Sequence, residues 1–223
     1  NWILRRKKSI GASDAACIVL EPGKAFKSRY ALWCDKLTPY DSSEIKGLSE
    51  QLEWGHRAEP MIAKAFKEET GRKITNPGPY TIQYHPRYDF ISCTVDRMQY
   101  DQERGEGVLE IKNYSEFGRK QWEDGVPDIY YIQLQHQLAV TGCQWGSLAV
   151  LIGGNHFHSV DIDRDDGLID NILQMEIEFW ELVKTETPPK FDGEESSRKS
   201  FVRLHPNDNG ERVVLPNEAD ALY

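Results

Sequence analysis

Two carboxylates and a lysine stand at spacings that suit divalent-metal chemistry. Glu110 and Lys112 are separated by one residue within the run 108–112, whose other residues are apolar. If this run is a strand, alternate side chains face opposite ways, so the carboxylate and the amine share one surface. Asp96 ends an earlier segment of strand character, 90–96, and a polar turn containing glycines predicts a hairpin between the two. We therefore expect Asp96 to lie near Glu110.

This arrangement indicates phosphodiester hydrolysis. Mg²⁺ accepts hard oxygen ligands, needs few of them from the protein, and leaves positions for water and a substrate phosphate. Such an ion lowers the pKa of a bound water and offsets charge on phosphoryl oxygens. Lys112 would then position the attacking water. A Glu-x-Lys pair is also common on exposed strands, where it contributes under about 1 kcal/mol, so the spacing alone leaves a surface ion pair as the alternative.

Length and composition allow one enzyme-sized core. The chain has 223 residues, of which 39% are hydrophobic. We expect a single domain over residues 1–191, followed at a polar stretch by a C-terminal extension, 192–223, that packs on the core or on a neighbouring subunit. No run of about 18 apolar residues and no signal-like opening segment occurs, which predicts a soluble cytoplasmic protein and no membrane partner. Four scattered cysteines without a CxxC pair argue against a zinc ribbon or an iron–sulfur cluster.

The formal charge of −9 is unusual for a protein that binds nucleic acid, but the charge is unevenly distributed. Residues 1–30 contain seven basic and two acidic residues, whereas the remainder contains 20 basic and 34 acidic residues. Positive charge is therefore concentrated near the start of the sequence. A solvated basic segment is the alternative, although bound cations also allow a nuclease to tolerate acidity.

Three helices are expected to carry further polar side chains. Small residues with Ser13 or Asp14 as a cap predict a helix start able to bind an anion. Apolar residues at three-to-four spacing predict a helix over 49–70, ended by Gly71. Glu59 falls on that helix, either as a site residue or as an ordinary surface carboxylate. A third helix runs from Asp128 to Gly142, with three glutamines that form a polar face or position phosphate and water.

The remaining elements complete an α/β or α+β fold, in which helices flank a central mixed sheet. The sequence predicts a short helix over 26–37, strands over 147–152 and 156–162, and an amphipathic helix over 169–184.

As a set, six ordered blocks resemble the YqaJ-type viral recombinases, the phage lambda exonuclease family. The resemblance covers roughly residues 5–190, and the order of the blocks makes chance agreement improbable. The blocks are Ser9–Ala16, Trp54–Pro60, Thr94–Asp96, Leu109–Lys112, Trp122–Pro127 and Gln133–Gln137.

The resemblance implies the restriction-endonuclease-like core of the PD-(D/E)xK nucleases and assigns roles residue by residue. Asp96, Glu110 and the carbonyl of Ile111 match metal ligands, Lys112 matches the catalytic lysine, and Glu59 matches the helix carboxylate of a second metal. Five further residues match positions that hold the 5′-phosphate of the DNA or lie beside them: Arg6, Ser13, Thr94, Gln133 and Gln135. Thr94 replaces the serine of the best-known member and Val95 replaces the usual proline, and neither change removes a ligand.

The implied activity is processive 5′-to-3′ digestion of one strand of linear double-stranded DNA from 5′-phosphorylated ends, leaving 3′ single strands for recombination. The implied cofactor is Mg²⁺, with Mn²⁺ as an alternative ion and two ions per site. The resemblance also implies a homotrimeric ring around DNA, a single-strand annealing partner, and a phage or prophage gene in a bacterial host cell. Acidic residues on the outside of such a ring would account for the net charge.

Two other functions fit the same residues. A related nuclease would cut closed circles or single strands at least as well as linear duplex. A non-catalytic DNA-end-binding protein would bind ends without metal-dependent cleavage, which the intact set of Asp96, Glu110 and Lys112 argues against.

Overall fold

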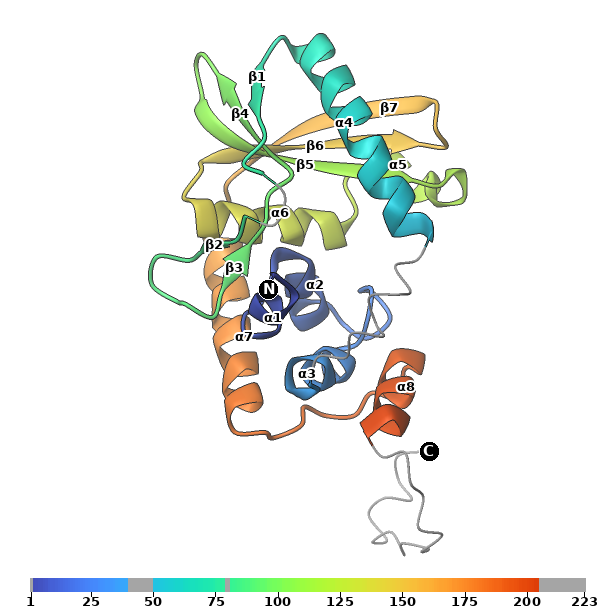
Figure 1. Ribbon diagram of the computed structural model, residues 1–223, viewed down its shortest axis with the longest axis vertical. Coiled ribbons are helices and arrows are strands. Elements are labelled where there is room, and N and C mark those ends of the chain that lie inside the picture. The colour runs from blue at the N-terminus through green and yellow to red at the C-terminus, as the bar shows by residue number, and fades with distance from the viewer. Residues whose placement is uncertain (1, 40–49, 79–80, 205–223) are drawn as a thin grey trace, which may run out of the picture.

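A five-stranded mixed sheet organises the fold (Figure 1). The computed structural model describes residues 2–39, 50–78 and 81–204. The strand order is β1-β4-β5-β6-β7. The strands are β1 (Lys73–Thr75), β4 (Arg97–Asp101), β5 (Gly105–Tyr114), β6 (Trp145–Ile152) and β7 (His156–Asp163). Helices lie on both faces of the sheet, so the expected α/β fold with a flanked mixed sheet is confirmed.

The connection between β5 and β6 explains why the sheet is mixed. β4 and β5 form an antiparallel hairpin, and β6 and β7 form another. β5 and β6 are parallel, so the chain must cross over between them. The crossover contains a 3₁₀ turn (Glu116–Gly118), α5 (Lys120–Glu123) and α6 (Asp128–Thr141). Gly142 ends α6 in the left-handed conformation, with φ of 76°.

Strand alternation distributes the side chains of β5 between two helices. Leu109 and Ile111 pack beneath α4 (Glu50–Thr70), together with Phe66 of that helix. Val108, on the opposite face, packs with α6 through Leu134. The central strand is therefore covered on both faces, as Figure 1 shows for the helices α4 and α6.

A second layer of helices lies beyond α6 (Figure 1). It contains α1 (Trp2–Lys7), α2 (Ala12–Val19), α3 (Arg29–Leu37), α7 (Asp166–Lys184) and α8 (Glu195–Leu204). α8 belongs to the expected C-terminal extension and lies against α3, where the buried hydroxyls of Ser197 and Ser28 are 2.6 Å apart. Residues 205–223 of that extension lie outside the described residues, and the domain boundary at 191 stays a prediction.

Two local expectations were wrong. The segment 90–96 is not one strand, because only Ser92–Cys93 forms β3. β3 pairs with β2 (Gln83–Tyr84) in a separate two-stranded sheet, and β4 begins after Asp96. The cause is tertiary, because Ile10 bridges to Ile91 just before β3. α2 also starts earlier than expected, with Gly11 as its N-cap and a bond from the Gly11 amide to the Asp14 carboxylate at 3.0 Å.

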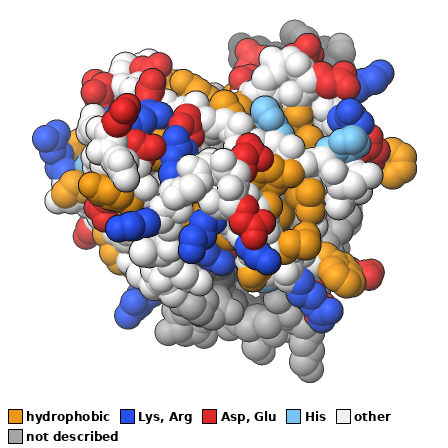
Figure 2. Space-filling view, turned by 90° about the horizontal axis from the view of Figure 1, so that it is seen from above, with side chains coloured by type: hydrophobic (Ala, Val, Ile, Leu, Met, Phe, Trp, Pro, Cys, Tyr) orange, Lys and Arg blue, Asp and Glu red, His pale blue; other side chains and the backbone are white. Residues whose placement is uncertain are grey.

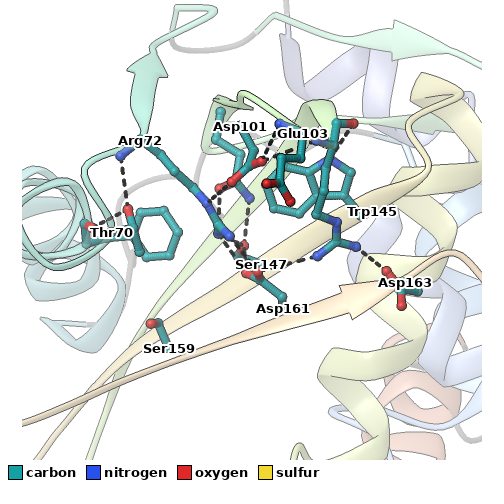
Figure 3. A network of polar contacts seen from close by, with 12 residues as sticks. Thr70, Arg72, Asp101, Glu103, Trp145, Ser147, Ser159, Asp161 and Asp163 are labelled. Carbon is teal, nitrogen blue, oxygen red and sulfur yellow. Dashed lines mark hydrogen bonds and ion pairs between the residues drawn. The ribbon is translucent and has the colours of Figure 1, made fainter.

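Arg72 connects three strands of the sheet through polar contacts (Figure 3). Arg72 donates to both carboxylate oxygens of Asp161 on β7, at 2.8 and 2.6 Å, and to Asp101 on β4 at 3.1 Å. The guanidinium carbons of Arg72 and Arg104 also lie 4.7 and 4.3 Å from the ring centroid of Trp145. These contacts join β4, β6 and β7. Within the described part of the chain, no helix is both long and apolar enough to cross a membrane.

Candidate active site

The β4–β5 hairpin brings Asp96 to Glu110. The register pairs Arg97 with Leu109, so extending it by one residue places Asp96 opposite Glu110. The Ile111 amide donates to the Asp96 carboxylate at 2.8 Å, which fixes the side chain against the β5 backbone. The first carboxylate thus approaches the second although it lies outside the strand.

Glu110 is a buried carboxylate held by three donors. It is only 4% exposed. One of its oxygens accepts from Lys112 Nζ at 2.7 Å and from Gln133 Nε2 at 2.6 Å. The other accepts from Gln137 Nε2 at 2.7 Å. Lys112 in turn donates to Gln133 Oε1 at 3.1 Å and lies 4.9 Å from the ring centroid of Tyr130, so its amine is also fixed.

The electrostatics of Asp96 favour a cation. Burial, together with the carboxylates of Glu110 and Glu59, holds the pKa of Asp96 well above its usual range, although Lys112 and the Ile111 amide act the other way. The ionised form of Asp96 is therefore disfavoured as long as no further positive charge is present. Two oxygen-donor side chains with a neighbouring backbone carbonyl suit Mg²⁺, which needs few protein ligands.

Glu59 lies near this group but has a different partner. Its carboxylate forms an ion pair with the Arg97 guanidinium, which also donates to the backbone carbonyl of Asp96. Among the described residues, no three His, Cys, Asp or Glu side chains are grouped so that they could hold a metal together. Asp96 and Glu110 therefore approach each other across the hairpin, whereas the Glu59 carboxylate is paired with Arg97.

The glutamines of α6 divide between two sides of the helix. Gln133 and Gln137 are one helical turn apart and both reach Glu110. Gln135 faces away, donates to the Asp163 carbonyl at 2.8 Å, and accepts from the Asp165 amide at 3.0 Å. The structure therefore does not bring Gln135 to the site, and all three glutamines are buried rather than forming a solvated face. The four-residue spacing of Gln133 and Gln137 could have indicated Gln137, which our sequence reasoning missed.

The expected phosphate-binding residues occupy neighbouring elements. Arg6 Nη2 donates to Ser13 Oγ at 3.0 Å, joining α1 to the first turn of α2. Thr94 precedes Asp96 by two residues, and its carbonyl receives a long hydrogen bond, 3.4 Å, from Gln137. Arg6 and Ser13 are thus brought together, while Thr94 is tied to the carboxylate group through Gln137.

A fully buried ion pair anchors the other side of α6. His136 lies 2.7 Å from the Glu176 carboxylate through Nδ1 and donates through Nε2 to the Ser92 carbonyl at 2.9 Å. Burial alone would lower the pKa of His136, but Glu176 and the Ser92 carbonyl raise it. The Ser92 carbonyl can only accept, so Nε2 is the donor in that bond, and the Glu176 carboxylate beside Nδ1 stabilises the protonated ring. This contact joins α6 and α7 to β3, which leads directly into Thr94 and Asp96.

The surface charge is mixed on the face drawn in Figure 2. Lys and Arg side chains alternate there with Asp and Glu side chains and with exposed hydrophobic groups. The basic residues near the start of the chain are in part engaged within the protein, since Lys7 donates to the Thr38 carbonyl at 2.9 Å. Net charge alone is therefore a poor guide to where DNA would bind.

The sequence comparison identifies the family of this chain. The model of the YqaJ-like viral recombinase domain matches residues 1–144, and the chain belongs to this family. An uncharacterized protein YqaJ from Bacillus subtilis (strain 168) is 36% identical over 217 residues, or 96% of this chain. The chain spans 65% of the length of that relative.

Solved structures share the fold. An alkaline exonuclease from Laribacter hongkongensis superposes with a TM-score of 0.66 and 21% identity, over 91% of this chain and 98% of that one. The same enzyme in complex with dAMP gives 0.64 and 22%, over 92% and 97%. A phage related exonuclease from Haemophilus somnus 129PT gives 0.55 and 14%, over 80% and 96%. At these identities the likeness establishes the architecture, and the residues of the site carry the functional argument.

Proposed function

We propose that this protein is a metal-dependent exonuclease that degrades one strand of linear double-stranded DNA in the 5′-to-3′ direction. The observation that carries the proposal is the group formed by Asp96, Glu110 and Lys112, in which the lysine is held 2.7 Å from the buried glutamate. Membership of the YqaJ-like viral recombinase domain family supports the same class of reaction, and so do the structural relatives, which include an alkaline exonuclease and a phage related exonuclease.

The residues divide the work of hydrolysis. Asp96, Glu110 and the carbonyl of Ile111 would hold Mg²⁺, or Mn²⁺ in its place. The bound ion supplies an activated water and offsets the charge of the phosphoryl oxygens. Gln133 donates to Glu110 and so fixes the orientation of that carboxylate. Lys112, fixed by Glu110 and Gln133, positions the attacking water for in-line displacement.

Glu59 is the carboxylate available to the second ion that the family pattern implies. Its present partner is the guanidinium of Arg97. A second divalent ion would therefore have to compete with a fixed cation for the same carboxylate.

Recognition of the DNA end belongs to α1 and α2 in this proposal. Arg6 and Ser13 lie within hydrogen-bonding distance, and a guanidinium beside a hydroxyl suits a terminal 5′-phosphate through charge-assisted hydrogen bonds. Thr94 would complete the pocket beside the metal ligands. Gln135 is left out, because its amide is bonded to the backbone where β7 leads into α7.

The wider setting is also part of the proposal. Cutting from 5′-phosphorylated ends would leave 3′ single strands for phage-type recombination, with a single-strand annealing protein as partner. A homotrimeric ring would enclose the duplex, and the protein would act in the cytoplasm of a bacterial host cell that carries the phage or prophage.

One assay tests the function. Purified protein is incubated with 5′-phosphorylated linear duplex, closed circular duplex and single-stranded DNA, each with and without Mg²⁺. We expect digestion of the linear duplex only with Mg²⁺, and no digestion by a folded Lys112→Ala variant. Preferential cutting of circles or single strands would assign a different nuclease, and activity of Lys112→Ala at the wild-type rate would refute the mechanism.

Recognition of the 5′-phosphate has its own test. Removing the 5′-phosphate should slow the wild-type enzyme and affect an Arg6→Ala variant much less. Equal slowing of both proteins would rule out the assigned phosphate pocket.

A further inference from the structure

Arg97 places a fixed positive charge inside the proposed catalytic group. It is the first residue of β4, directly after Asp96, and only 8% of its surface is exposed. Its guanidinium pairs with Glu59 on α4 and donates to the Asp96 carbonyl. Arg97 thus bridges the helix that carries one carboxylate and the backbone of the residue that carries another.

Two features hold this bridge in place. The side chains of Arg97 and Glu59 are 10% and 25% exposed, so water screens the pair only in part. The strand pairing of Arg97 with Leu109 fixes its backbone beside β5. Separating Arg97 from Glu59 would leave two partly buried charges without their partner.

The local charges show how many cations the group requires. The carboxylates of Asp96, Glu110 and Glu59 face two side-chain cations, Lys112 on Glu110 and Arg97 on Glu59. One net negative charge remains, and it lies on Asp96, whose carboxylate contacts only a backbone amide among the described bonds. One divalent ion is enough to reverse that charge, whereas a second would leave the group strongly positive before DNA arrives.

We propose that Arg97 is the resident cation of Glu59 and stands in place of a second divalent ion. The DNA-free chain then binds one divalent ion, on Asp96, Glu110 and the Ile111 carbonyl. Arg97 is a positioning residue that acts through Glu59 and through the backbone of Asp96. The inference rests on the proposed function, since it concerns the same metal site.

Counting bound ions tests the inference without measuring activity. Isothermal titration calorimetry with Mn²⁺ alone should give one ion per chain for the wild-type protein and for Glu59→Gln. In Arg97→Gln, Glu59 loses its cation, and we expect a second ion that disappears again in the double variant with Glu59→Gln. Arg57→Gln is the matched control, because Arg57 lies on the same helix and pairs with Glu53 instead of Glu59. It should leave the count at one.

The outcomes distinguish a failure of the role assigned to Arg97 from a failure of the proposed function. Two ions on the wild-type chain, falling to one in Glu59→Gln, would overturn the role of Arg97 and leave the nuclease function standing. No ion on a folded wild-type chain would refute the metal-dependent function itself. Circular dichroism checks the fold of each variant. Should Arg97→Gln fail to fold, the wild-type and Glu59→Gln counts still decide between one ion and two.

Discussion

Gln137 gives the sharpest test of how the site is supported. The side chain is fully buried, and its amide donates to Glu110 at 2.7 Å and more weakly to the Thr94 carbonyl at 3.4 Å. Gln137→Leu keeps a similar volume and removes the donor. One oxygen of the buried Glu110 carboxylate then has no remaining hydrogen bond among those found for the described residues.

The expected loss of stability in Gln137→Leu follows from two opposing effects. A hydrogen bond to a charged group contributes about 1.5–3 kcal/mol. Gln137 Oε1 is itself buried without a partner, so the substitution also removes an unsatisfied group and recovers about 1 kcal/mol. We expect a net loss of about 0.5–2 kcal/mol, which lowers the Tm of a domain of this size by roughly 1–8 °C. If Glu110 holds Mg²⁺ as proposed, loss of the residue that orients it should weaken Mg²⁺ binding or activity about 10- to 100-fold.

The assay combines thermal unfolding with the rate of duplex digestion at increasing Mg²⁺. Gln174→Leu is the matched control, since Gln174 is exposed and bonded to Glu178 on the surface of α7, at 2.8 Å. It should change stability by less than about 0.5 kcal/mol and leave the Mg²⁺ requirement alone. A Gln137→Leu protein with wild-type Tm and wild-type Mg²⁺ dependence would refute the assigned support of Glu110.

Three other substitutions probe the same framework. Asp96→Asn should raise the Tm of the protein without divalent ions at pH 7, because a raised carboxyl pKa means that the ionised form is disfavoured in the folded chain; an unchanged or lower Tm in calorimetry contradicts this. Glu176→Gln should lower the free energy of unfolding most below pH 6.5, where His136 is charged in both the folded and the unfolded chain. The difference from wild type should shrink as the pH rises through the raised pKa of His136. A difference that grows with pH would contradict the pairing of charged His136 with Glu176. Gly107→Ala should destabilise the fold by about 1–3 kcal/mol in urea unfolding, because its methyl group would lie 2.6 Å from the Trp145 ring; wild-type stability would show that the ring moves freely.

Local patterns were sufficient wherever backbone geometry alone sets the outcome. Strand alternation correctly separated Glu110 and Lys112 from Leu109 and Ile111, because successive side chains of a strand must face opposite ways. Gly71 was correctly predicted to end α4, where it adopts a φ of 69° that glycine accepts without strain. The mixed sheet flanked by helices also followed from such patterns.

Local patterns failed where distant segments compete for the backbone. The run 90–96 has strand composition throughout, yet only Ser92–Cys93 forms a strand there. Ile10 pairs beside it at Ile91, and His136 takes the Ser92 carbonyl. Asp96 consequently stands outside β4, and its place beside Glu110 is secured by a bond to the Ile111 amide instead.

The glutamines of α6 show a second limit. A helix buried on all sides has no polar face from which the orientation of its side chains can be read. α6 lies between the sheet and α7. For this reason Gln133 and Gln137 face the sheet, whereas Gln135 faces the start of α7.

The contact between Glu110 and Lys112 could therefore be predicted from the sequence alone, since a carboxylate and an amine two residues apart on a strand share a face. The partner of each charge was not. Glu59 and Arg97 are 38 residues apart in sequence, and they meet only because α4 packs over the sheet that β4 and β5 form. Tertiary packing thus decides which carboxylates remain available to a metal, because the cation that pairs with a half-buried carboxylate comes from a segment distant in sequence.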